Sequence, residues 1–158
     1  MYNVFCSELV EHIPISVKLE DVPNITISGI SCSEGGILFL ADKTRKLIYR
    51  LDVQTCSSFS FGEGKLSKSC LLWSLLLFIL TLFTLDNPAD VAVCHGYLLV
   101  LDKNAIHVFS MMGVWLSKWE ARFPEETLRM SVLFPYVYVS SVDGVHTFEI
   151  VISWTAPL

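Results

Sequence analysis

Aspartate and histidine side chains, which could bind a metal ion or transfer protons, recur at matched places along this sequence. Asp42 and Asp102 each end an apolar run, and His107 and His146 occupy equivalent positions in two later runs. An aspartate that ends a strand typically accepts hydrogen bonds from backbone amides of the following turn. A calcium site would instead need several carboxylates converging at about 2.3–2.6 Å from the ion. Because the sequence shows no matching set of acidic and amide residues, we expect no metal site and no cofactor.

Motifs for covalent catalysis are missing from the sequence. No serine lies in a G-x-S-x-G motif, and no cysteine has a recognisable histidine partner. The stretch Glu34-Gly35-Gly36 is typical of an ordinary turn and not of a phosphate-binding loop. We expect His107 and His146 to be packing or surface residues. The sequence therefore predicts no catalytic residues, and we expect that the protein is not an enzyme.

The charge and cysteine patterns narrow the choice of partners and compartment. The formal net charge is −5 without any run of lysine or arginine, whereas phosphate binding needs a clustered basic face, so we expect no nucleic-acid partner. The 5 cysteines contain no C-x-x-C pair, which fits neither a zinc site nor a disulfide framework. Cys32 and Cys94 are expected to be small buried hydrophobes in matching strands. With no signal peptide in residues 1–15, these features favour a cytoplasmic protein.

The elements that position these side chains come from an internal repeat. An apolar β-rich run, a polar break and a second β-rich run recur at Ile37 to Asp52, Tyr97 to Ser110 and Tyr136 to Glu149. Ile106 of the second run matches Val145 of the third at an offset of 39 along the chain. A repeat period of about 40 residues is typical of propellers and repeat arrays. We therefore expect three similar antiparallel β-units, the second and third lying next to each other.

The spacing between the first two units is longer than the repeat requires. Ile48 matches Ile106 at an offset of 58, which leaves a surplus of about 20 residues over the repeat period. The surplus contains the charge-free stretch Ser69 to Leu85, SCLLWSLLLFILTLFTL. Because this stretch is rich in leucine and has neither glycine nor proline, we expect one helix of about four turns over Leu71 to Leu85.

Three interpretations of this helix stay open. As a single membrane span, marked by Leu71, Trp73, Phe78 and Leu85, it would place the first two units on opposite faces of a bilayer. As a buried core helix, it would need a protein shell around its whole circumference. As an insertion foreign to the domain, for example a variant-specific segment, it would leave the repeat intact. The surplus length favours the insertion.

The residues of the second unit carry a family resemblance. The stretch PADVAVCHGYLLVLDKNAIHVFSMMGVWLSKW resembles the NHL repeat of six-bladed β-propellers: a proline, alternating apolar residues, a glycine turn, a run ending in aspartate, and an I-x-V-F strand. In the first unit, ISGISCSEGGILFLADKTRKLIYRLD resembles the same pattern and the related YWTD-type blade. The third unit departs from the pattern, with Ser140-Ser141 in place of the aspartate. Its Asp143-Gly144 pair predicts a type I′ hairpin turn.

The resemblance, which covers residues 25–61 and 86–150, implies an all-β fold, an incomplete β-propeller of about three antiparallel blades. The composition of Leu71 to Leu85 adds one apolar helix that interrupts it. Since propellers close with about 4–8 blades, the expected ring is open. The expected segments are an N-terminal edge segment (1–24), unit one (25–61), an apolar insertion or transmembrane helix (62–85), unit two (86–120), unit three (121–150) and a tail (151–158).

Aromatic residues are the candidates for partner binding. Trp115 and Trp119 lie four apart in an expected strand, and Tyr136 and Tyr138 lie two apart, so we expect each pair to share a face. They would either fill the space between blades or bind a protein partner, because Trp and Tyr dominate binding hot spots. We expect a non-catalytic β-propeller-type interaction module, a fragment or variant of a larger propeller. A small single-pass membrane protein anchored by residues 69–85 and a fragment of a propeller hydrolase remain as alternatives.

Overall fold

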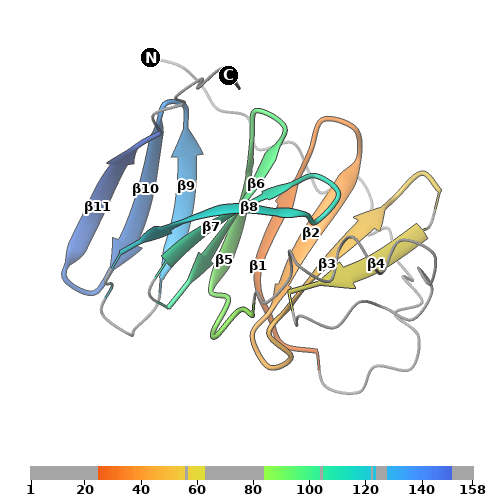
Figure 1. The fold of residues 1–158 in the computed structure, drawn as a ribbon, viewed down its shortest axis with the longest axis horizontal. Coiled ribbons are helices and arrows are strands. Elements are labelled where there is room, and N and C mark those ends of the chain that lie inside the picture. The colour runs from red at the N-terminus through yellow and green to blue at the C-terminus, as the bar shows by residue number, and fades with distance from the viewer. Residues whose placement is uncertain are drawn as a thin grey trace, which may run out of the picture.

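The computed structural model describes residues 25–55, 57–62, 84–103, 105–121, 123 and 128–150 (Figure 1). These residues form eleven β-strands and no helix, so the predicted all-β class is confirmed for the part of the chain that is described. In chain order the strands are β1 (Ile27–Cys32), β2 (Ile37–Asp42), β3 (Leu47–Asp52), β4 (Ser57–Phe61), β5 (Asp90–Cys94), β6 (Tyr97–Asp102), β7 (Ala105–Ser110), β8 (Trp115–Glu120), β9 (Arg129–Leu133), β10 (Tyr136–Ser141) and β11 (Gly144–Glu149).

The strands form three antiparallel sheets, one for each repeat unit, which we call blades one, two and three. Blade one has the order β1-β2-β3-β4, blade two has the order β5-β6-β7-β8, and blade three has the order β11-β10-β9. Figure 1 shows the blades side by side, with β1 next to β5 and β5 next to β9. Val100 in β6 and Tyr138 in β10 lie in corresponding strands of adjacent blades, so this prediction from the repeat is confirmed.

The sheets pack face to face because β6, in the middle blade, is apolar on both of its faces. Leu98 and Val100 contact the side of blade one, whereas Leu99 and Leu101 contact the side of blade three. All four side chains are buried, because successive residues of a strand point to opposite faces. A continuous apolar run of this kind therefore requires a neighbouring sheet on both sides.

Two apolar cores hold the blades together. The blade one–two core consists of Phe39, Ala41, Ile48, Leu85, Val91, Leu98, Val100 and Phe109. The blade two–three core consists of Ala92, Leu99, Leu101, Ile106, Phe123, Leu128, Met130, Val137 and Val139. Full burial of one Leu, Ile or Phe side chain contributes about 1.5–3 kcal/mol relative to its exposure to water. Each interface between blades is thus stabilised by several such residues.

The glycine turn of blade two lies where the repeat pattern predicts it, whereas the turn of blade three differs from the predicted one. His95-Gly96, between β5 and β6, has φ values of 47° and 77°, which is the pattern of a type I′ turn. The type I′ turn predicted at Asp143-Gly144 is wrong. Ser141 pairs directly with Gly144, so the loop consists of Val142 and Asp143, and neither of these has a positive φ.

The predicted burial of Cys32 is also wrong. Gly29 and Ser31 of β1 contact β5 of blade two, so Cys32 points to the other face of the strand and is exposed. Cys94 is half-buried against the blade two–three core. Burial there raises the pKa of the Cys94 thiol.

The predicted apolar helix, including Leu71, Trp73 and Phe78, lies outside the described residues except for its last two positions. Leu85 is not helical: it is 1% exposed in the blade one–two core, and its N–H donates to the carbonyl oxygen of Gly62 at 3.1 Å. The helical prediction is therefore wrong at Leu85, where extended pairing and burial decide the conformation. Within the described ranges, no helix is long and apolar enough to cross a membrane. The segments 1–24 and 151–158 lie outside these ranges as well.

Candidate functional site

The two tryptophans that were candidates for partner binding do not share a face. Ile106 pairs with Trp119, but Phe109 pairs with Trp115 after a bulge in β8. The bulge adds one residue and reverses the alternation of side chains. Trp115 packs against the blade one–two core and Trp119 against the blade two–three core, so the predicted shared face is wrong. Both rings lie between blades rather than on one surface.

The two candidate tyrosines lie together on blade three, as predicted. Tyr136 and Tyr138 point to the side of β10 opposite Val137 and Val139, which are buried against blade two. Their ring centroids are 6.4 Å apart. The structure therefore brings these two residues, and not the tryptophans, onto one solvent-facing surface.

We call this surface the outer face of blade three and define it by strand register. One row contains Val145, Ser140 and Arg129, the middle row contains Thr147, Tyr138 and Ser131, and the last row contains Glu149, Tyr136 and Leu133. Leu133 is 71% exposed, Val145 is 68% exposed and Tyr136 is 40% exposed. Large apolar side chains thus lie in contact with water on the face of a regular sheet.

The outer face of blade three is equivalent to a surface that is covered in blade two. At the repeat offset of 39, Tyr138 corresponds to Leu99 and Val145 to Ile106. Leu99 and Ile106 are buried where blade three packs on blade two. Blade three therefore repeats the strand pattern of blade two. Among the described residues, however, no sheet packs on its outer face. Comparison of Val145 with Ile106 at this offset could have identified Val145 from the sequence.

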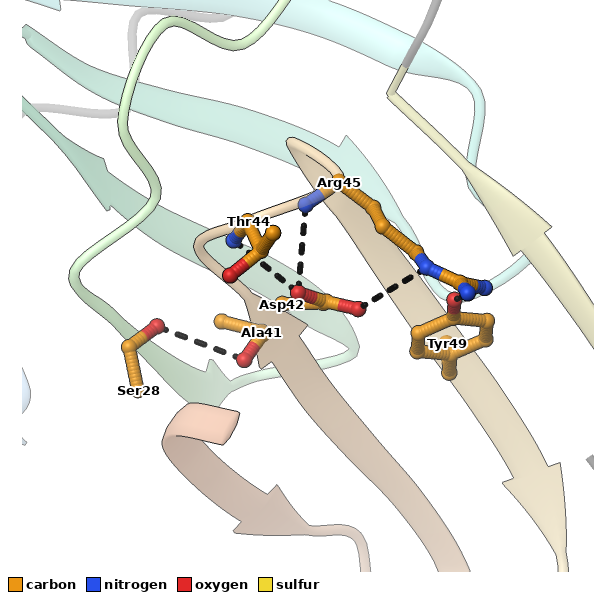
Figure 2. A network of polar contacts seen from close by, with 6 residues as sticks. All are labelled: Ser28, Ala41, Asp42, Thr44, Arg45 and Tyr49. Atoms are coloured by element: carbon orange, nitrogen blue, oxygen red, sulfur yellow. Dashed lines mark hydrogen bonds and ion pairs between the residues drawn. The ribbon is translucent and has the colours of Figure 1, made fainter. Parts of the chain in front are cut away.

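The strand-ending aspartates bind backbone amides, as predicted. Figure 2 shows Asp42, whose Oδ1 accepts hydrogen bonds from the N–H groups of Thr44 at 3.0 Å and Arg45 at 3.2 Å. Arg45 also lies 3.9 Å from the second carboxylate oxygen and donates to the Tyr49 hydroxyl at 3.4 Å. Asp42 thereby fixes the turn between β2 and β3.

Asp102 also accepts hydrogen bonds from backbone amides, and two of these amides are distant in the sequence. Its carboxylate accepts hydrogen bonds from the backbone N–H of Lys103 at 2.7 Å, Asn87 at 2.6 Å and Asp86 at 2.8 Å, and it lies 3.6 Å from His107 Nε2. Burial disfavours the charged form, but the contact with His107 and the amides outweighs burial and lowers the pKa of Asp102. Asp102 therefore ties the segment that enters blade two to a turn at the far end of β6.

Asp90 joins all three blades, and no local feature of the sequence predicted this role. Its carboxylate accepts hydrogen bonds from Val91 N–H at 2.9 Å and, across the blade interface, from Met130 N–H at 2.9 Å. On its other side lies Gly29 of β1. Next to it, Arg129 donates from Nη1 to three backbone carbonyls: those of Ser28 at 3.0 Å, Leu128 at 3.3 Å and Ala89 at 3.5 Å.

Ser141, Asp143 and His146 contain the residue types of a catalytic triad, but their geometry differs from one. His146 Nε2 lies 3.0 Å from Ser141 Oγ and 3.1 Å from Asp143 Oδ1. In a triad the serine and the aspartate bind opposite nitrogens of the imidazole, so that a proton can pass between them. The hydrogen bonds from Ser141 and His146 lower the pKa of Asp143. The arrangement stabilises the β10–β11 turn.

His107 and His146 occupy equivalent positions, as the repeat predicted. His107 lies beside Asp102 on the face of blade two that packs on blade one. The ring of His146 contacts Phe123 at a centroid distance of 5.8 Å, on the face of blade three that packs on blade two. In the part of the chain that is described, no group of three His, Cys, Asp or Glu residues is placed to hold a metal ion.

Comparison with known proteins supports the fold. No protein-family model and no curated protein sequence matches the chain. A streptogramin B lyase structure is 14% identical with a TM-score of 0.51, covering 82% of this chain and 42% of the lyase chain. Saccharomyces cerevisiae Sqt1 is 12% identical with a TM-score of 0.54, covering 80% of this chain and 31% of Sqt1. Myxococcus xanthus glutaminyl cyclase is 11% identical with a TM-score of 0.50, covering 81% of this chain and 50% of the cyclase.

These three proteins are β-propellers, and at this level of identity the likeness concerns the fold alone. The chain spans half or less of the length of each of them. The described residues therefore have a propeller-like fold of three adjacent blades.

Proposed function

We propose that this chain is a non-catalytic β-propeller module that binds a protein partner and forms part of a larger propeller. The observation that carries the proposal is the outer face of blade three, where Val145 is exposed and Tyr138 is half-buried although their equivalents in blade two, Ile106 and Leu99, are buried. Exposed apolar patches on a folded surface mark sites of interaction. The tyrosines at its centre are residues that typically dominate protein interfaces.

The polar groups of the described residues support a non-catalytic role. Asp42, Asp90 and Asp102 hold backbone amides, which is a structural task. In Ser141, Asp143 and His146, the serine and the aspartate share one imidazole nitrogen. Although a lyase and a cyclase are among the similar structures, their activities belong to those proteins and the fold alone does not transfer them.

We assign the blades to the NHL type and the segment between blades one and two to an insertion. The connection between β4 and β5 runs from position 62 to position 89, whereas the connection between β8 and β9 runs only from position 121 to position 128. The hydrogen bond between Leu85 and Gly62 brings the two ends of the surplus together. Since blades one and two share one core, both lie on the same side of any bilayer, so a single crossing between them is incompatible with this packing. We propose that the protein is cytoplasmic. In cell fractionation it should then be recovered in the cytosol, and a membrane fraction that retains it after a carbonate wash would contradict this location.

The proposal is tested by capture of partners with the full chain in cells. The variant Tyr138→Asp puts a charge at the centre of the outer face. Val142→Asp is the matched control, because Val142 is exposed in the adjoining turn and does not belong to the face. We expect a set of proteins that Tyr138→Asp loses and Val142→Asp retains, measured by quantitative mass spectrometry. Equal recovery with both variants would contradict the proposal.

A further inference from the structure

We infer that the end of the blades that is uppermost in Figure 1 binds an extended protein segment that carries arginine or lysine residues. This surface consists of residues 33–36, 53–55, 95–97 and 134–135, which form or adjoin the turns after β1, β3, β5 and β9, and we call it the hairpin row. The hairpin row is separate from the outer face of blade three, so the inference goes beyond the proposed function.

Hydrogen bonds join neighbouring turns of the hairpin row. Within blade one, Val53 N–H donates to the carbonyl oxygen of Gly36 at 3.2 Å. Between blades one and two, Val93 N–H donates to Ser31 Oγ at 3.1 Å, next to the turns that follow β1 and β5. The turns of blades one and two therefore form one continuous surface.

A contact between aromatic rings extends the hairpin row to blade three. The rings of His95 and Phe134 are nearly perpendicular, at 77°, and their centroids lie 4.3 Å apart. Phe134 is 44% exposed, and Tyr97, which follows the turn between β5 and β6, is 41% exposed. The face of such a ring attracts a lysine or arginine cation. Blades two and three thus present exposed aromatic rings at this end.

Blade one contributes negative charge to the hairpin row. Glu34 is exposed in the turn between β1 and β2, and Asp52 directly precedes the turn between β3 and β4. Asp52 Oδ1 accepts hydrogen bonds from the backbone N–H of Thr55 at 3.1 Å and of Gln54 at 3.0 Å. The hydrogen bond from Thr55 is the main cause that lowers the pKa of Asp52. This carboxylate is therefore ionised at neutral pH.

The described turns of the hairpin row contain no lysine or arginine. Arg50 of β3 is held elsewhere: its Nε donates to the carbonyl oxygen of Met111 at 3.1 Å, and its guanidinium carbon lies 5.3 Å from the centroid of the Phe59 ring. At the opposite end of blade one, the turn between β2 and β3 exposes Lys43 and Lys46. Carboxylates and aromatic rings therefore lie in the hairpin row without a lysine or arginine from the same turns.

Charge and length select the partner. Carboxylates and aromatic faces both attract cations, and arginine can also stack on a ring and donate two hydrogen bonds to a carboxylate. Packed sheets lie about 10 Å apart, so the hairpin row extends about 20 Å from blade one to blade three. An extended segment of about six residues spans this length at about 3.3 Å per residue. One cation would lie at Glu34 and another at Tyr97 and Phe134.

Fluorescence anisotropy of the full chain tests the inference, with a labelled octapeptide of alternating arginine and serine as the probe. At about 50 mM salt, where surface charges are only partly screened, this peptide should bind and the same peptide with glutamine in place of arginine should not. Glu34→Gln should raise the Kd about threefold, because one exposed charge pair is lost. Asp86→Asn is the matched control, since it changes the net charge equally at the opposite end of the blades and should leave the Kd unchanged.

Tyr97→Leu tests the aromatic part of the hairpin row. It should also raise the Kd about threefold, because it removes the ring and keeps an apolar side chain. Tyr136→Leu is its matched control, since Tyr136 is 40% exposed on the outer face of blade three and should not contribute. Thermal unfolding of each variant shows whether a change in Kd comes from loss of folded protein.

Three results would overturn the inference: no binding of the arginine peptide, equal binding of the glutamine peptide, or equal effects of a variant and its control. Binding that appears only after removal of residues 1–24 and 151–158 would overturn it as well, since the surface would then be covered by the chain itself. Tyr138→Asp should leave peptide binding unchanged, so the proposed function and this inference succeed or fail separately.

Discussion

Gly29 of β1 and Asp90 of β5 fit together so closely that a β-carbon on Gly29 would lie 2.6 Å from the Asp90 Cα atom. The contact involves backbone, so movement of the Asp90 side chain cannot relieve it. Because Asp90 also accepts the hydrogen bond from Met130 N–H, this one site fixes the first strands of all three blades relative to one another.

Gly29→Ala should therefore destabilise the fold by about 3 kcal/mol, at the upper end of the cost of overpacking. The measurement is urea unfolding followed by circular dichroism. Gly35→Ala is the control, because the nearest atom to its added β-carbon, Ser33 Oγ, lies 3.9 Å away. We expect that control to change stability by less than about 0.5 kcal/mol, as surface substitutions usually do. Equal stability of the two variants would refute the tight contact.

Asp102→Asn should destabilise the protein at pH 7 by about 2 kcal/mol. Both carboxylate oxygens accept hydrogen bonds from backbone N–H groups, so the NH₂ group of asparagine would place a donor against a donor and at least one hydrogen bond would be lost. The folded pKa of Asp102 lies below its ordinary value of 3.8. The stabilisation by the ionised group is therefore complete above this ordinary value and is lost as the pH falls through the folded pKa. We expect the difference between wild type and variant to shrink below about pH 3.8 in urea titrations at several pH values. A difference that stays constant down to pH 2 would contradict this assignment.

Removal of residues 64–83 should leave the blades folded, because Gly62 and Leu85 already lie next to each other. The deletion must stop before Leu85, which is buried in the blade one–two core. Thermal unfolding should remain cooperative in the shortened chain. In the full chain, Leu85→Ala should cost about 2–5 kcal/mol, as is typical for a buried leucine. Loss of cooperative unfolding in the shortened chain would show that the segment is required for the core.

A fluorophosphonate probe, which labels activated serines, should not react with Ser141. His146 Nε2 contacts both Ser141 and Asp143, so the ring cannot accept the serine proton at one nitrogen while the carboxylate orients the other. Intact-mass spectrometry after incubation measures the labelling. Stoichiometric labelling that disappears in Ser141→Ala would instead indicate a catalytic serine.

The sequence was most informative where the interactions are local. The alternation and the offset of 39 located blades two and three, and the strand-ending positions of Asp42 and Asp102 predicted their hydrogen bonds to the following turns. These features depend on residues a few positions apart. The type I′ turn predicted at Asp143-Gly144 is wrong, because the register of the strands makes Val142 and Asp143 the loop residues.

Features that depend on distant residues were not predictable in the same way. The side of β8 on which Trp115 lies is set by a bulge that forms against β7, and one added residue reverses the face. Asp90 has its partner Met130 in another blade, 40 positions along the chain. The exposure of Val145 results from the lack of a covering sheet among the described residues, whereas its apolar character suggested burial.

The hydrogen bond between Leu85 and Gly62 also means that the connection between β4 and β5 can accommodate added sequence. The entropic cost of closing a flexible loop rises by only about 0.6 kcal/mol for each doubling of its length, provided that its two ends stay where they are. The blades hold these ends through a hydrogen bond and a buried leucine. A reporter domain with neighbouring termini could therefore be accommodated between residues 62 and 84, and changes in gene structure at this point could lengthen or shorten the protein without altering its blades.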